Sequence, residues 1–166
     1  LVELHTEAER RGLVFHMHVE EQPREIEACR AAYGATPMRL LLDRLETLER
    51  FTAVHCTHTA PDELAAFFDR GGAACICPLT EANLGDGLAD GATLASGASR
   101  VALGSDSNAR ISMLEEMRLL EYGQRLAGER RGVLRDPSGA LAPRLLDVAT
   151  ASGASARGLE AGSIEV

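Results

Sequence analysis

The sequence predicts an α/β fold that forms the C-terminal half of a (β/α)8 TIM barrel. Short, almost continuously apolar segments alternate along the chain with segments of helical pattern. Continuous apolarity in short segments is typical of parallel strands buried on both faces, and strands that alternate with helices imply right-handed crossovers. Polar residues end several of the apolar segments. This favours a barrel, because catalytic residues in barrels occupy the C-terminal ends of different strands.

Four strands are expected, at residues 13–18, 51–55, 73–77 and 101–106. Four β/α units cannot close an eight-stranded barrel, which usually contains about 250 residues. We therefore interpret the chain as a fragment and expect the missing half before Leu1.

The first two helices are expected where good helix formers follow a proline. Residues 25–32 form one helix, because Pro23 suits a first turn and Gly34 suits the position after the last turn. Residues 37–48 form the next, with one apolar face that carries Leu40, Leu41, Leu45 and Leu48.

Two further helices are expected, one before the third strand and one after the fourth. One begins near Pro61, where Asp62 and Glu63 place acidic charge in the first turn, and ends at Gly71 and Gly72. The longest covers residues 112–126, and its inner side is expected to carry Met113, Leu114, Met117, Leu120 and Tyr122.

Composition narrows the class of protein. The 166 residues are 45% hydrophobic and carry a formal net charge of -8, which is typical of one globular unit. An acidic chain without a basic patch is a poor partner for nucleic acid. No run approaches the roughly 18 apolar residues of a membrane span, and residues 1–5 do not read as a signal peptide, so we expect a cytoplasmic protein with no membrane partner.

The cysteines and one histidine have structural interpretations. Four cysteines at irregular spacing indicate reduced thiols rather than a disulfide framework. Cys75 and Cys77 stand two apart in an expected buried strand, where a small apolar thiol is common, and this disfavours a structural zinc site. His16 is expected to have a buried structural role one layer below His18.

His18 and Glu21 stand three residues apart at the end of the first expected strand. Hydrolytic deamination needs a metal ion that lowers the pKa of a bound water and a carboxyl group that moves its proton to the leaving nitrogen. The pair therefore offers a metal ligand and a proton shuttle. The alternative is a core histidine followed by ordinary acidic residues at a helix start.

Two more strand ends carry candidate groups. His55 ends the second expected strand and Asp106 ends the fourth, so their side chains should converge with His18 on one face. Imidazole and carboxylate ligands suit zinc, iron or manganese. Thr57 and His58 either support this site or belong only to the loop.

The order of these motifs resembles the amidohydrolase superfamily of metal-dependent hydrolases. More narrowly, residues 16–22, 55–59, 77–87 and 105–111 resemble formiminoglutamate deiminases. Related guanine and chlorotriazine-type deaminases usually carry Cys-Pro-x-Ser-Asn in the third block, so residues 79–83 distinguish between them.

The resemblance implies roles for four residues. His18 and Asp106 would be metal ligands, Asp106 would also help to activate water, Glu21 would be the proton shuttle and His55 would stabilise the attacking water or the tetrahedral intermediate. It implies one divalent metal ion, preferably zinc, no other cofactor and a small-molecule substrate. The implied reaction converts N-formimino-L-glutamate and water into N-formyl-L-glutamate and ammonia. A homodimer of the full-length protein is left open.

One departure from the family pattern is the missing His-x-His pair of its first strand, because His5 lies in a helix-like stretch. Residues 1–160 are expected to form the partial barrel, and residues 161–166 the return into a small β-sandwich. Two alternatives stay open: a deaminase of guanine or a triazine-like cyclic amidine, and a barrel fragment without catalysis.

Overall fold

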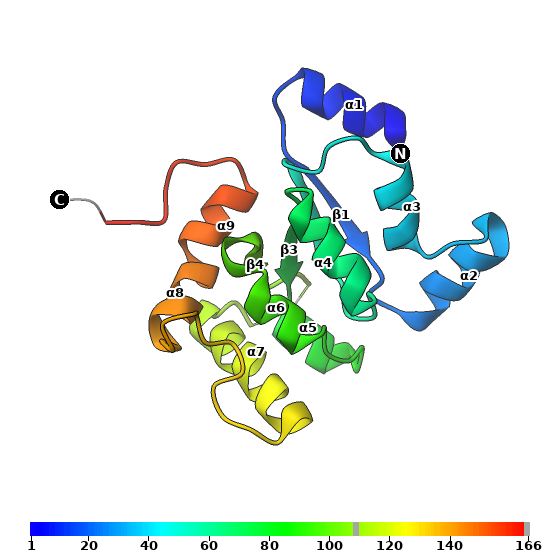
Figure 1. The fold of residues 1–166 in the computed structure, drawn as a ribbon. Coiled ribbons are helices and arrows are strands. Elements are labelled where there is room, and N and C mark those ends of the chain that lie inside the picture. The colour runs from blue at the N-terminus through cyan, green and yellow to red at the C-terminus, as the bar shows by residue number, and fades with distance from the viewer. Residues whose placement is uncertain (108–109, 165–166) are drawn as a thin grey trace.

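A computed structural model describes residues 1–107 and 110–164 of the chain (Figure 1). The strands are β1 (Phe15–Val19), β2 (Phe51–His55), β3 (Ala73–Ile76) and β4 (Val101–Leu103). The helices are α1 (Val2–Arg10), α2 (Pro23–Tyr33), α3 (Pro37–Arg44), α4 (Pro61–Asp69), α5 (Pro78–Leu84), α6 (Gly91–Ser96), α7 (Met113–Gly128), α8 (Ala142–Ala149) and α9 (Ala151–Ala156), with a 3-10 turn η1 (Ala98–Arg100). Within the described ranges, no helix is long and apolar enough to cross a membrane.

The strands form one parallel sheet in the order β1-β2-β3-β4. Each strand is joined to its neighbour by at least one helix, because parallel strands need a crossover connection. The predicted parallel α/β architecture is therefore confirmed. The fourth strand is shorter than predicted and ends at Leu103, so Asp106 lies in the loop beyond it.

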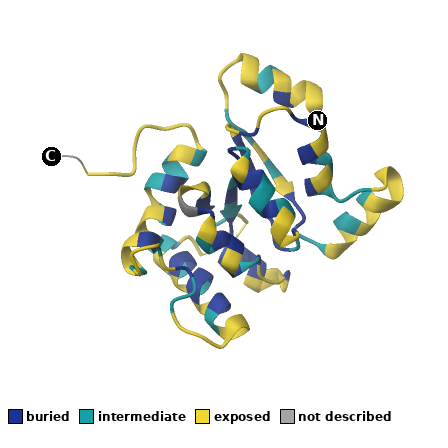
Figure 2. Cartoon of the chain, in the orientation of Figure 1, coloured by how far each residue is buried: buried dark blue, intermediate teal, exposed yellow. Residues whose placement is uncertain are grey.

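The core lies between the sheet and the helices that follow β1 and β2. Phe51 of β2 is 1% exposed, and its ring centroid lies 5.2 Å from that of Phe15 and 5.8 Å from that of Phe67 in α4. Figure 2 shows the buried stripes of α3 and α4 turned toward the sheet. Full burial of side chains of this size contributes roughly 1.5–3 kcal/mol each.

Alternation along β1 places its two histidines on the face that the core helices do not cover. Phe15, Met17 and Val19 pack against the core, whereas His16 and His18 are exposed. The expected buried role of His16 is therefore wrong. Its Nε2 atom lies 3.0 Å from the carbonyl oxygen of Ala156. The period of two residues in a strand explains the result, because His16 must share the face of His18.

The helix boundaries follow the expected caps with one exception. α2 starts at Pro23 and is followed by Gly34 in the left-handed conformation, with φ 75°. α3 ends at Arg44, earlier than the predicted residue 48, because Leu45 already adopts an extended conformation. Leu45 remains buried, so its apolar periodicity reflects the core and not the helix.

The inner face of α7 differs from the prediction. Met117 and Leu120 are buried, but Leu114 is 69% exposed and Tyr122 is 48% exposed. Glu116 and Glu121 occupy the inner face instead. Glu116 accepts a hydrogen bond from the N–H of Leu79 in the first turn of α5, and Glu121 accepts from the N–H groups of Gly132, Val133 and Leu134 in the loop after α7. The apolar pattern of the sequence does not reveal buried acids that satisfy backbone amides elsewhere in the chain.

Candidate active site at the strand ends

The candidate site lies at the carboxyl ends of the strands. His18 stands near the end of β1, Glu21 follows β1, His55 ends β2 and Asp106 follows β4. Parallel strands present these ends at one edge of the sheet, which is where β/α barrels hold catalytic residues.

Sharp backbone turns orient these side chains. His55, Cys56 and Asp106 are not glycines, yet their φ angles are 75°, 53° and 47°. Positive φ is uncommon for such residues and costs on the order of 1–3 kcal/mol each. In the sheet His55 pairs with Val19, whose side chain lies in the core. The left-handed backbone at His55 turns its ring toward His18 instead.

The structure brings all four predicted residues together. His18 Nδ1 lies 4.0 Å from Glu21 Oε2, and His18 Nε2 lies 3.9 Å from Asp106 Oδ1. His55 Nε2 lies 3.6 Å from Glu21 Oε1. The rings of His18 and His55 meet edge to face, with centroids 4.7 Å apart and an interplanar angle of 89°. Two imidazoles and two carboxylates therefore share one small volume.

Burial differs across this cluster. The side chain of His55 is fully buried, those of Glu21 and Asp106 are 20% and 19% exposed, and that of His18 is 58% exposed. The cluster is closed at His55 and open at His18. A ligand can therefore approach along the His18 side.

His55 combines a satisfied and an unsatisfied ring nitrogen. Its Nδ1 atom lies 3.2 Å from Glu81 Oε1, whereas its buried Nε2 atom has no hydrogen-bond partner. Burial by itself would lower the pKa of His55. The contact with Glu81 and the negative charges of Glu21, Glu81 and Asp106 outweigh burial, so the pKa of His55 is raised above its ordinary value.

The donors present fit a metal ion. His18, Glu21 and His55 each offer a ligand atom, and these atoms lie within 4.8 Å of one another. Asp106 adds a carboxylate oxygen beside His18. The unpartnered Nε2 of His55 is the kind of buried lone pair that a bound ion or polarised water would satisfy. Imidazole and carboxylate ligands are typical of zinc.

Thr57 and His58 lie in the turn that follows β2. Thr57 is buried, His58 is half-buried, and the Thr57 Oγ1 and His58 Nε2 atoms have no hydrogen-bond partner. Asn108 and Ala109, which belong to the motif around Asp106, lie outside the described residues, as do Glu165 and Val166 of the expected return segment.

Sequence reasoning missed Glu81. It is 2% exposed and contacts His55, although it stands in the first turn of α5 and reads as an ordinary acidic residue at a helix start. The contact joins residues 26 positions apart, so only the pairing of β2 with β3 reveals it.

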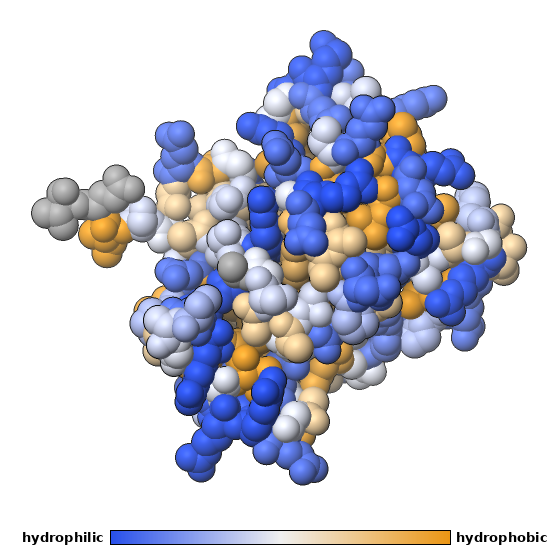
Figure 3. Space-filling model, in the orientation of Figure 1, coloured by the Kyte–Doolittle hydropathy of each residue, from blue (hydrophilic) through white to orange (hydrophobic). Residues whose placement is uncertain are grey.

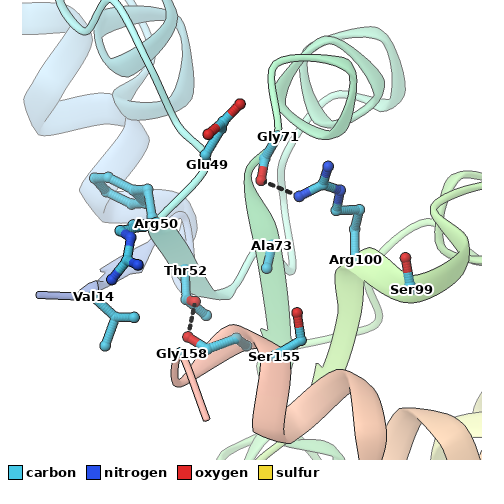
Figure 4. Close-up of a pocket in the computed structure, with 12 residues that line it drawn as sticks. Val14, Glu49, Arg50, Thr52, Gly71, Ala73, Ser99, Arg100, Ser155 and Gly158 are labelled. Atoms are coloured by element: carbon cyan, nitrogen blue, oxygen red, sulfur yellow. Dashed lines mark hydrogen bonds between the residues drawn. The ribbon is translucent and has the colours of Figure 1, made fainter. Parts of the chain in front are cut away.

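A separate pocket of about 170 Å³ lies at the opposite, amino ends of the strands (Figure 4). Arg50 and Arg100 border it, and each donates a hydrogen bond to a backbone carbonyl, at Gly12 and Gly71 respectively. Thr52 and Ala156 also line the pocket, and the Thr52 hydroxyl donates a hydrogen bond to the Ala156 carbonyl oxygen. This position separates the pocket from the cluster around His55.

Comparison with known proteins gives consistent matches. The model of the amidohydrolase family matches residues 1–166. The chain is 40% identical over 155 residues to formimidoylglutamate deiminase of Pseudomonas aeruginosa, a match that covers 93% of this chain and 34% of that protein. It is 33% identical over 153 residues to a 5-methylthioadenosine/S-adenosylhomocysteine deaminase of Moorella thermoacetica, covering 90% of this chain and 34% of that protein. Its fold matches the crystal structure of an adenosine deaminase from Xanthomonas campestris with bound zinc at a TM-score of 0.86 and 26% identity, covering 99% of this chain and 37% of that one.

The chain spans about a third of the length of these curated relatives. Its four parallel β/α units are part of a (β/α)8 barrel of the metal-dependent hydrolase type, as predicted. With a family match over its whole length and a strand-end cluster of histidines and carboxylates, the chain belongs to the amidohydrolase family.

Proposed function

We propose that this chain is part of a metal-dependent deiminase that hydrolyses N-formimino-L-glutamate to N-formyl-L-glutamate and ammonia, a step of histidine degradation in the cytoplasm. The observation that carries the chemistry is the cluster of His18, Glu21, His55 and Asp106 at the strand ends. The similarity to formimidoylglutamate deiminase supports the choice of substrate.

His18 and Asp106 are the residues we assign to hold the metal. A bound divalent ion such as zinc would lower the pKa of a coordinated water to about 7, so that hydroxide is available near neutral pH. His18 lies on the open side of the cluster, where a substrate can enter, and Asp106 lies beside it with its Oδ1 atom 3.9 Å from His18 Nε2.

Glu21 is assigned to move the proton. Its two carboxylate oxygens face different imidazoles, Oε2 toward His18 and Oε1 toward His55. From there Glu21 accepts a proton from the attacking water and passes it to the formimino nitrogen, which gives a tetrahedral intermediate with a hydroxyl and an amino group. The hydroxyl proton then moves to the same nitrogen as the carbon–nitrogen bond breaks, so ammonia leaves and the carbon keeps the oxygen from water as the formyl carbonyl.

His55 is assigned to stabilise the oxygen that gains negative charge. Its buried Nε2 atom points toward Glu21 and lacks a partner within the chain. The raised pKa of His55 favours uptake of a proton at Nε2, and the imidazolium so formed can donate a hydrogen bond to an oxyanion.

A deaminase of another amidine is the competing function. The 33% identity to a 5-methylthioadenosine/S-adenosylhomocysteine deaminase supports it, because the same cluster suits hydrolysis of a cyclic amidine. The two functions differ only in the substrate that fits.

The test is ammonia release by the full-length gene product. N-formimino-L-glutamate, 5′-methylthioadenosine and guanine are compared at equal concentration, before and after chelation and zinc restoration. We expect formiminoglutamate to be turned over most rapidly, with loss on chelation and recovery with zinc. Faster turnover of a purine would overturn the substrate, and full activity in metal-free protein would overturn the mechanism.

A further inference from the structure

The first turn of α5 connects three strand ends around the candidate site. We infer that Glu81, in this turn, is a positioning residue that fixes the tautomer and orientation of His55. The inference rests on the proposed function, because it assigns Glu81 to the same site. Glu81 contacts His55 and Cys77, and all three residues belong to the part of the chain that the structure describes.

The carboxylate of Glu81 is held by the backbone of its own turn. Its Oε1 atom accepts a hydrogen bond from the N–H of Cys77 at 2.8 Å. The N–H of Glu81 also donates to the carbonyl oxygen of Cys77, at 2.9 Å, as the first backbone hydrogen bond of the helix. The side chain of Glu81 thus reaches back to the N-cap N–H, as the acidic residue of a capping box does, and this contact positions the carboxylate independently of His55.

The same Oε1 atom lies 3.2 Å from Nδ1 of His55, and both side chains are at most 2% exposed. Because Oε1 already acts as an acceptor for Cys77, the proton in this contact belongs to the imidazole. Neutral His55 therefore carries its hydrogen on Nδ1 and keeps a bare lone pair on Nε2. Hydrogen bonds to one ring nitrogen commonly set the role of the other in this way.

The contact between Glu81 and His55 also affects Glu21, the assigned proton shuttle. With Nδ1 held by Glu81, Nε2 of His55 is directed toward Glu21 Oε1 at 3.6 Å. The opposite tautomer would leave Nδ1 without a hydrogen for Glu81 and place one on Nε2. Glu81 thus prepares His55 to accept or share a proton on the side where the substrate binds.

Two neighbours tie the same turn to the rest of the site. Thr80 donates a hydrogen bond from Oγ1 to the carbonyl oxygen of Ser105, at 3.0 Å, in the loop that carries Asp106. Leu79 donates its N–H to Glu116 Oε2 of α7 at 2.9 Å. The turn is therefore braced from β4 and α7, and Glu81 alone of these residues contacts an imidazole of the cluster in the described structure.

The alternative is that Glu81 only caps α5. Glu116 offers a matched control that separates the two roles. Glu116 is a fully buried glutamate that accepts a hydrogen bond from a backbone N–H of the same turn, but that N–H belongs to Leu79 and not to a histidine. Glu81→Gln and Glu116→Gln both retain a carbonyl oxygen as acceptor. Only Glu81→Gln replaces a charged acceptor of His55 by a weaker, neutral one, and this lessens the preference for a hydrogen on Nδ1.

The experiment combines kinetics and NMR on the zinc-loaded full-length gene product. Kinetics use the best substrate from the panel above. Nitrogen-15 spectra of histidine-labelled protein, assigned with His55→Asn, report which ring nitrogen of His55 carries the hydrogen.

We expect the hydrogen on Nδ1 in the wild type and a shift toward Nε2 in Glu81→Gln. The kcat of Glu81→Gln should fall about 10- to 100-fold, the usual effect of losing a group that orients a site histidine, with little change in KM, zinc content or melting temperature. Glu116→Gln should stay within about threefold of the wild-type kcat.

A wild-type His55 that carries its hydrogen on Nε2 overturns the inference, as does a kcat within twofold in Glu81→Gln. Equal losses of activity, zinc and melting temperature in both variants would reduce Glu81 to a structural role. If the wild type hydrolyses none of the substrates, the proposed function fails, and the NMR result still decides the inference. If Glu81→Gln does not fold, the wild-type spectrum decides it.

Discussion

At the scale of single residues, the site depends on how little freedom His55 has. Its backbone is left-handed, its side chain is fully buried, and its two ring nitrogens face Glu81 and Glu21. His18 differs, since more than half of its side chain is exposed. A buried imidazole suits a fixed role in the reaction, whereas an exposed one can meet an incoming ligand.

Glu21→Gln tests the proton shuttle. The amide preserves the shape of the side chain but cannot exchange a proton, so we expect kcat to fall about 10²- to 10⁴-fold in the full-length gene product. Zinc content should stay normal, because His18 and Asp106 are the assigned ligands. Steady-state ammonia release and metal analysis give the two measurements.

Glu27→Gln, an exposed change in α2, serves as the control for Glu21→Gln and should keep wild-type turnover. Loss of zinc in Glu21→Gln would make Glu21 a ligand, in line with its membership of the three-residue group with His18 and His55. Normal turnover with normal zinc would assign the shuttle to another residue.

The sequence predicts the four cluster residues because each follows a short apolar run, and such runs end at one edge of a parallel sheet. This reasoning does not predict the role of Glu81, because strand pairing and not sequence spacing brings Glu81 to His55. It also does not predict that His16 is exposed. Strand alternation does predict its face, but only the structure shows that this face is uncovered.

At the scale of elements, caps were more predictable than helix faces. Proline in the first turn and glycine after the last turn located α2 and α4 correctly, because these residues act through local backbone geometry. The face of α7 depends on loops that reach it from elsewhere in the chain. Glu121 is buried because three consecutive loop N–H groups need an acceptor, which no helical periodicity can reveal.

Thr36→Ala tests the cap of α3. The Thr36 hydroxyl accepts a hydrogen bond from the N–H of Arg39 at 3.1 Å and donates one to Glu63 of α4 at 2.9 Å. Loss of such a cap costs about 1 kcal/mol, so the unfolding midpoint should fall. Turnover should not change, because these hydrogen bonds join α3 to α4 and not to the cluster.

Thr36→Ser is the control, since it keeps the hydroxyl and should recover most of the lost stability. Chemical denaturation of both variants of the full-length gene product gives the comparison. An unchanged midpoint in Thr36→Ala would show that water or another group replaces the cap.

At the scale of the whole molecule, the sheet ends in two open edges. β1 pairs with β2 and β4 pairs with β3, so each outer strand of the described sheet has one paired side. Unpaired edges expose backbone N–H and C=O groups that can pair with another chain. Apolar side chains also reach the surface among hydrophilic ones on the face shown in Figure 3. Leu114, Tyr122 and Leu146 border an apolar groove between α7 and α8.

Residues 1–166 expressed alone should therefore be inactive, bind zinc weakly and tend to associate. Catalytic zinc sites usually hold three protein ligands, and this chain offers His18 and Asp106 with His55 as a third candidate. Ammonia release and calorimetric zinc titration give the test, with size-exclusion chromatography to measure association. We expect zinc affinity at least tenfold below that of the full-length gene product, equivalent to about 1.4 kcal/mol, and abolished by His18→Ala. Strong turnover by the isolated chain would show that ligands from outside these residues are dispensable, and the assignment of the metal site would then be wrong.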